Sequence, residues 1–313
     1  MKNYKICVCL FVLGVMGTKI SAQNKECDYI SSRYYHKAAQ AELFWLEGNY
    51  KECYHILSEL DSTCVLLNGD CNELYHFVEL CLLYENYLKA FESIRSYITN
   101  YGVKLNDFKD LPNFRKMKKM PEWSSWKKEL LSLEKNFVSD SKLYNEIIKM
   151  HEDCQRYNNI DSSTMKRDSI YNVNFQKLIH IISTKGFPLS SSIKYYHYER
   201  SEVFFALYSM LSHFASDSLI VNYFKTTLPQ YIRQGDCPPD MLSSIIDMYQ
   251  WRNKQLSLYG INMPSPEKIF EYDKLDERRR YIGLPDYELS KQLSAKRIAL
   301  RNATNTGSQK KRR

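Results

Sequence analysis

The side chains with the clearest chemical potential in this sequence are His213 and Asp247, each in a segment with helical periodicity. An imidazole that is oriented by a carboxylate can act as a general base. Tyr259 and Arg279 could add a phenol and a guanidinium to the same polar pocket. These four residues are the catalytic candidates. None is assigned a catalytic role, because a helical histidine bonded to a carboxylate is more often structural.

The motifs that accompany such a pair in common enzyme classes are missing. The sequence has no Gly-x-Ser-x-Gly nucleophile elbow, no glycine-rich phosphate loop and no His-Glu-x-x-His metal motif. His151, Glu152 and Asp153 are adjacent, so they point in different directions around a helix and do not form a ligand set. We expect no metal and no cofactor, and the sequence favours a protein that is not an enzyme.

Three consecutive arginines lie in the segment "DERRRYIGLPDY", residues 276 to 287. Spacing of three and four residues places Asp276 on the same helix face as Arg279 and Arg280, where the charges should pair. We expect Arg278 to be solvated, and Gly283 to end the helix. Of the three arginines, Arg279 is the one that could face a pocket.

A second candidate surface is the aromatic segment 193–202, "IKYYHYERSE". Aromatic side chains of this kind stack on sugars, bases or peptides. The residues that could contact a partner are Tyr195, Tyr196, His197 and Tyr198. The alternative is that these rings cover the edge of a hydrophobic core.

The start of the chain indicates export. Residues 1–22 combine a basic start, an apolar stretch and a small-residue cleavage site, which is the pattern of a signal peptide. An uncleaved membrane anchor is the alternative, but the apolar run is shorter than the roughly 20 residues that span a bilayer. We expect a periplasmic or secreted protein that has no transmembrane segment after signal cleavage.

The positive charge of the protein is concentrated in the two ends of the chain. Segment 1–22 has three lysines and no acid, and residues 291–313 have eight basic residues and no acid. The formal net charge of +8 therefore becomes −3 for the part between them. A nucleic-acid partner is not supported. We expect 291–313 to be a disordered tail that could touch anionic surfaces.

Seven cysteines remain after cleavage of the signal peptide, so at least one is unpaired in a monomer. Export permits disulfides. Cys64 and Cys71 flank a predicted loop between helices and are the best candidates for a bridge. Metal binding is not favoured, because no Cys-x-x-Cys motif is present.

The elements that must position these side chains are all predicted to be helices. Apolar residues recur at helical spacing, and 25 tyrosines with only 10 glycines suit packed helices. The sequence thus predicts an all-α protein with helical hairpins over 28–100, followed by a connector with one helix over 101–140. A second all-α domain is expected over 141–290.

The first region resembles the tetratricopeptide repeat. Gly48-Asn49-Tyr50 matches the inter-helix turn of that family, and Cys53 stands at its small packing position. Asn86-Tyr87 and Ala90 repeat the pattern 37 residues later, with Glu85 in place of the turn glycine. The resemblance implies a groove that binds peptides or partner proteins. In the alternative interpretation, these helices only pack against the second domain.

Short motifs between residues 148 and 290 occur in an order that resembles an uncharacterised family of bacterial domains of unknown function. The residues that match its pattern are Asp153, Gly186, Pro188, His213, Asp247, Tyr259, Gly260, Asp276 and Arg279. The chain departs from the pattern at Met248, Ser257, Ile261 and Asn262. Part of any polar site of that family is therefore missing here, and the resemblance implies architecture without chemistry.

Two functions follow as hypotheses. The first is an exported protein that recognises a protein or peptide of the cell envelope through the helical-repeat groove, without catalysis. The second is a hydrolase-like or small-ligand site around His213 and Asp247.

Overall fold

A computed structural model describes residues 27–67, 72–159, 164–261 and 264–310 of the chain. Within these ranges the protein is all-α, as the sequence predicts, and the β-structure is limited to one bridge between Ser257 and Ile269. The predicted signal peptide, 1–22, lies outside the described residues. No helix in the described part of the chain is long and apolar enough to cross a membrane.

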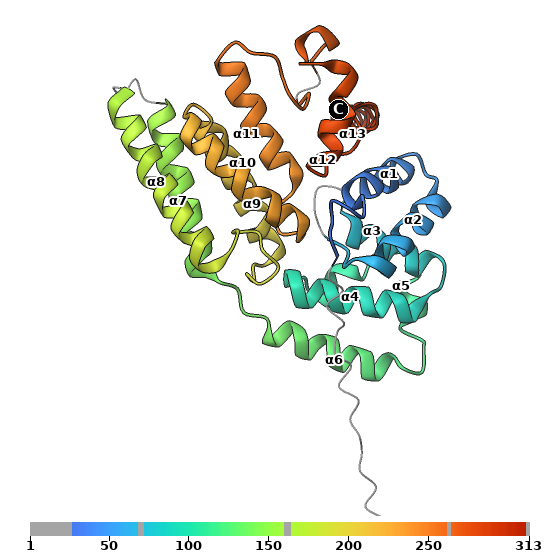
Figure 1. Ribbon diagram of the computed structural model, residues 1–313. Coiled ribbons are helices and arrows are strands. Elements are labelled where there is room, and N and C mark those ends of the chain that lie inside the picture. Colours follow the sequence, from blue (N-terminus) through green and yellow to red (C-terminus); the bar gives the residue numbers. More distant parts are fainter. Residues whose placement is uncertain (1–26, 68–71, 160–163, 262–263, 311–313) are drawn as a thin grey trace, which may run out of the picture.

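Two antiparallel helix pairs open the fold (Figure 1). The helices are α1 (Tyr34–Leu46), α2 (Tyr50–Thr63), α3 (Glu73–Leu83) and α4 (Tyr87–Tyr101). Gly48 makes the first turn with a φ of +76°, a conformation that costs glycine little. Glu85 takes the same left-handed conformation in the second turn, with a φ of +59°. Both predicted turns are confirmed. Cys53 and Ala90, the small residues after them, are fully buried between helices.

Residues 101–140, predicted as a connector, form three helical elements that pack with the first helices. These elements are η1 (Leu105–Phe108), α5 (Phe114–Met117) and α6 (Trp123–Asn136). The single long helix that the sequence predicts here is α6. However, Phe108, Phe114, Met117 and Leu130 are buried in the same hydrophobic cluster as α1–α4. The segment predicted as a connector thus packs against the first helices, because its apolar side chains are buried even though they lack helical spacing.

The second cluster is built mainly by five helices and also includes Ile282 and Leu284 from farther along the chain. The five helices are α7 (Ser141–Asn159), α8 (Thr164–Lys185), α9 (His197–Phe214), α10 (Ser218–Arg233) and α11 (Pro239–Arg252). Figure 1 shows α7 and α8 as a long pair beside α9, α10 and α11. Phe187, Phe214 and Phe224 are among its fully buried side chains.

The chain ends in helices that return to the first body. After η2 (Pro266–Lys268) and η3 (Tyr272–Lys274) come α12 (Leu275–Tyr281) and α13 (Tyr287–Lys310). Helix α13 packs on α1. Where the sequence predicts a disordered tail from residue 291, the structure continues α13 to residue 310. Lys291, Lys296, Arg297 and Arg301 lie on this helix, and Arg297 binds Glu42, 255 positions earlier in the chain.

The segment before α1 joins the two bodies. The backbone N–H of Tyr29 donates to the carbonyl of Arg233, 2.9 Å away, and Arg233 pairs with Asp28 at 2.9 Å. The Tyr35 hydroxyl donates to the carbonyl of Ile232 at 3.1 Å. The end of α10 and the beginning of α1 are thus held together by backbone and side-chain bonds.

Candidate functional site

Asp247 holds a loop. Its carboxylate accepts hydrogen bonds from the backbone N–H groups of Leu258 (2.7 Å), Tyr259 (3.0 Å) and Ile261 (3.0 Å). The hydroxyl of Ser257 donates to the same carboxylate at 2.6 Å. Asp247 lies in α11 and is only 7% exposed. Its oxygens are occupied by the loop that follows the helix, and Ser257 supplies one of the donors.

Arg279 fixes the same loop from the other side. Its side chain is 2% exposed and donates to the carbonyls of Tyr259 and Pro285 and to the hydroxyl of Ser290. Burial lowers the pKa of this guanidinium, and nearby carboxylates act in the opposite direction. Because all its bonds go to backbone and hydroxyl oxygens, Arg279 works as a buried cross-link between α12, the loop and α13.

His213 belongs to a different group. Its Nε2 lies 3.2 Å from the Nε2 of Gln155 on α7, and its ring stacks on Tyr171 with centroids 5.4 Å apart. The same Gln155 nitrogen lies 3.2 Å from Nε2 of His151. The hydrogen-bond acceptors of Asp247 are directed to residues 257–261. The structure therefore brings together Asp247, Tyr259 and Arg279, and places His213 in a separate polar contact between α7 and α9.

The arginine segment also differs from its prediction. Arg278 is not solvated, because its Nε donates to the carbonyl of Leu258 at 3.0 Å and the side chain is only 21% exposed. Arg280 pairs with Asp286 at 3.1 Å. The carboxylate of Asp276 accepts a hydrogen bond, 2.7 Å long, from the backbone N–H of Tyr287, the first residue of α13. Pairing along one helix face was the wrong expectation, since the loop and α13 offer closer partners.

The aromatic segment is divided between the interior and the surface. Tyr195 is fully buried. Tyr196 packs on Phe137, with ring centroids 5.2 Å apart, and His197 lies 5.9 Å from the ring of Tyr97. Tyr198 is 70% exposed. Tyr195 thus covers a core edge, whereas Tyr196, His197 and Tyr198 are exposed, with Tyr198 the most exposed of the segment's tyrosines.

The disulfide joins other residues than predicted. Cys64 is bonded to Cys27, with Cα atoms 5.2 Å apart, so the expected Cys64–Cys71 bridge is wrong. Cys71 lies outside the described residues. Cys53, Cys81, Cys154 and Cys237 are buried free thiols. Among the described residues, no three side chains of the metal-binding types converge.

A face that sequence reasoning missed lies on α1 and α3. We define the α1/α3 face by Glu42 and Trp45 on α1 and by Tyr75, His76 and Glu79 on α3. Trp45 stacks on His76 with ring centroids 4.1 Å apart and planes at 12°. Burial lowers the pKa of His76 to about 4, so its ring is neutral at pH 7. Burial also raises the pKa of the half-buried Glu79.

The centre of this face is an ion pair with the end of the chain. Glu42 is only 6% exposed, and its two carboxylate oxygens accept from Nε and Nη2 of Arg297 at 2.8 and 2.6 Å. Two parallel bonds of this kind are strong and geometrically selective. A glutamate on the buried side of an apolar helix was the available signal in the sequence. Its partner is 255 positions away, so the pair could not be read from spacing.

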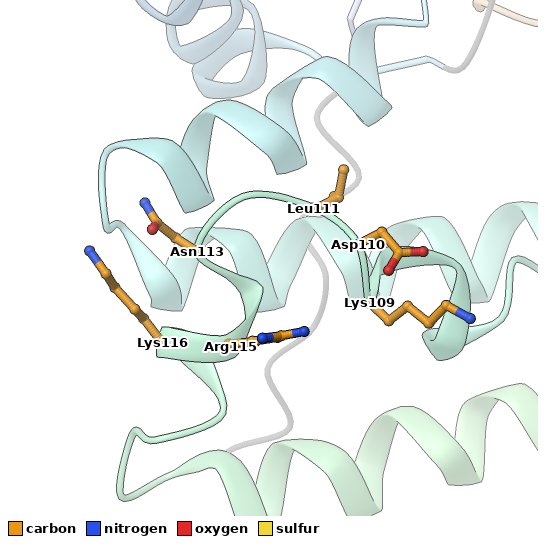
Figure 2. A pocket seen from close by; sticks show the side chains of 6 residues that line it. All are labelled: Lys109, Asp110, Leu111, Asn113, Arg115 and Lys116. Carbon is orange, nitrogen blue, oxygen red and sulfur yellow. The ribbon is translucent and has the colours of Figure 1, made fainter.

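A pocket of about 370 Å³ lies elsewhere, around α5. Figure 2 shows its lining side chains, with Lys109 and Asp110 at one side and Asn113 and Lys116 at the other. They do not converge on a common point. The pocket contains none of the candidates discussed above, and it gives no basis for a catalytic site.

Comparisons with known proteins add no relative. No family model, no curated protein and no solved structure matches this chain.

Proposed function

We propose that this protein is an exported interaction module that binds a protein or peptide of the cell envelope through the α1/α3 face, without catalysis. The observation that carries the proposal is the bidentate Glu42–Arg297 pair, in which this face already holds a helix. Docking of an amphipathic helix on a helical surface is a common mode of peptide recognition. The resemblance of residues 28–100 to tetratricopeptide repeats points to the same use.

The chemistry of the face supports recognition of a helix with a cationic side chain. Glu42 offers two acceptor oxygens from a nearly buried position, and the stacked rings of Trp45 and His76 lie beside it. A carboxylate selects a guanidinium, and a flat aromatic pair adds apolar contact area. Export is supported by the signal-like segment 1–22 and by the Cys27–Cys64 disulfide, since such bonds persist in oxidising compartments.

The alternative, a hydrolase-like or small-ligand site, is less well supported, because its candidate side chains are bonded to other parts of the protein. The hydrogen-bonding groups of Asp247 and Arg279 are bonded to the loop 257–261 and to α13. The Nε2 atom of His213 contacts Gln155. A site of this kind would need these groups to face a substrate.

Site-specific photo-cross-linking in cells tests the proposal. A photoreactive phenylalanine derivative replaces Glu79 on the α1/α3 face, and in a matched control it replaces the exposed Glu52 on α2. We expect a discrete adduct with an envelope protein from position 79 and none from position 52. If position 79 gives no adduct, or if both positions give the same adducts, the α1/α3 face is not the binding surface.

A further inference from the structure

The last helix of the chain is chemically matched to the α1/α3 face, which it meets on α1 at Glu42. Residues 291–313 carry eight basic side chains and no acid, and the face contributes Glu42 and Glu79. Arg297 is the contact between the two, with its side chain 40% exposed and that of Glu42 8% exposed. The carboxylate is therefore the buried partner, and a cation must be present to offset its desolvation.

Helix α13 is firmly held at its beginning and more exposed farther on. Tyr287 and Ser290 are bonded to Asp276 and Arg279, and Leu293 is 7% exposed. Beyond Arg297 the apolar side chains Ile298 and Leu300 are 54% and 42% exposed. Arg297 thus lies where α13 changes from a packed helix to one whose apolar side chains face solvent.

The stretch 293–303 has the composition of a docking helix. Basic residues alternate with Leu293, Ile298 and Leu300 along it. Apolar side chains that face solvent on a basic helix are a feature of segments that bind a partner surface. The side of α13 that is turned to the α1/α3 face is marked by Arg297, which binds Glu42, and by the buried Leu293 four positions before it.

We propose that α13 is an internal ligand of the α1/α3 face, and that the partner of this face is a basic amphipathic helix whose arginine replaces Arg297 on Glu42. This inference rests on the proposed function, because it names the kind of partner and the regulation of the same face. A tethered helix competes at an effective concentration on the order of millimolar. A free helix therefore binds the wild-type face only when its affinity is high enough to displace the tethered α13, as we expect of the natural partner.

The test uses the full chain and a charge reversal on α13. The probe is a fluorescent peptide with the sequence of residues 287–303, followed by anisotropy. In R297E, repulsion from Glu42 should release α13, and the peptide should bind at least tenfold more tightly than to the wild-type chain. The matched control is K296E, which makes the same charge change one position away on the same helix and should behave like the wild type.

A second measurement separates release of α13 from general unfolding. Amide hydrogen exchange of residues 293–303 should be at least tenfold faster in R297E than in the wild type, while exchange in α9 and α11 is unchanged. In the double variant E42R/R297E the swapped pair should restore slow exchange. A peptide that itself carries R297E should not bind the R297E chain.

The inference is overturned if the peptide binds the wild type as well as R297E. It is also overturned if R297E gives neither faster exchange in α13 nor peptide binding. These outcomes leave the proposed function standing when position 79 still cross-links to an envelope protein. In that case the partner has another chemistry. Loss of the cross-link together with intact peptide binding would instead remove the proposed function and keep α13 as a purely intramolecular ligand.

Discussion

At the scale of single residues, Asp247 and Arg279 each form hydrogen bonds that hold the loop 257–261 in place. Asp247 and Arg279 are 7% and 2% exposed, and each makes several hydrogen bonds to the loop 257–261 or its neighbours. Buried charges are tolerated when such bonds satisfy them. Their sequence separation of 32 positions hid this role. In the sequence, a carboxylate and a guanidinium on two helices are equally compatible with a catalytic site and with structural hydrogen bonds between elements.

Replacing Arg279 by methionine should lower the free energy of unfolding by about 3 kcal/mol, because buried carbonyls of Tyr259 and Pro285 lose their donor. Urea denaturation measures the change. The control R280M removes an exposed pair with Asp286 and should cost less than about 1 kcal/mol. Equal losses in the two variants would show that Arg279 is not the cross-link described above.

At the scale of elements, the disulfide ties the segment before α1 to the end of α2. The bond closes a loop of 37 positions between Cys27 and Cys64. The short separation along the chain favours Cys71 as the partner of Cys64. However, α1 and α2 pack as an antiparallel hairpin, which brings the end of α2, with Cys64, next to Cys27 before α1.

The variant C27S should therefore lose about 3–4 kcal/mol of stability under oxidising conditions, the amount expected for a closed loop of this length. Denaturant titrations with and without reductant measure it. The variant C71S should keep the wild-type stability and its dependence on reductant. Loss of that dependence in C71S, with none in C27S, would instead identify Cys71 as the partner of Cys64.

At the scale of the whole molecule, two hydrophobic clusters are joined by close packing of the segment before α1 on the end of α10. Gly235, with a φ of +78°, allows the ring of Tyr29 to approach the backbone. A Cβ atom at this position would lie 2.8 Å from that ring. The junction therefore depends on a residue without a side chain.

The variant G235A should lower the stability by about 2–4 kcal/mol, from the left-handed backbone and the displaced Tyr29 together. Gly48 is the matched control, since its φ is +76° and a Cβ there meets nothing within 4 Å. G48A should cost about 1 kcal/mol. Calorimetry of both variants checks the difference, and similar melting temperatures would contradict a tight junction at Gly235.

Much of the fold could be predicted because its signals are local. The turns at Gly48-Asn49 and Asn86-Tyr87, the helix 123–136 and the all-α class follow from apolar spacing and from residues that end helices. Of the four polar candidates, Asp247 and Arg279 both bind the backbone of Tyr259, while His213 lies apart from them; their catalytic use remains a prediction. The resemblances to repeat and domain families remain predictions.

The amino-acid sequence by itself determined the helices, because periodicity and stop signals act within a few residues. Only the tertiary structure decided which partner each polar or reactive group has. Cys64 is bonded to Cys27, and the basic end of the chain forms α13, which packs on α1. Glu42 pairs with Arg297, 255 positions away. The physical reason is that a buried charge or thiol is satisfied by whatever the packed helices bring within about 3 Å, and that neighbour is set by the whole fold.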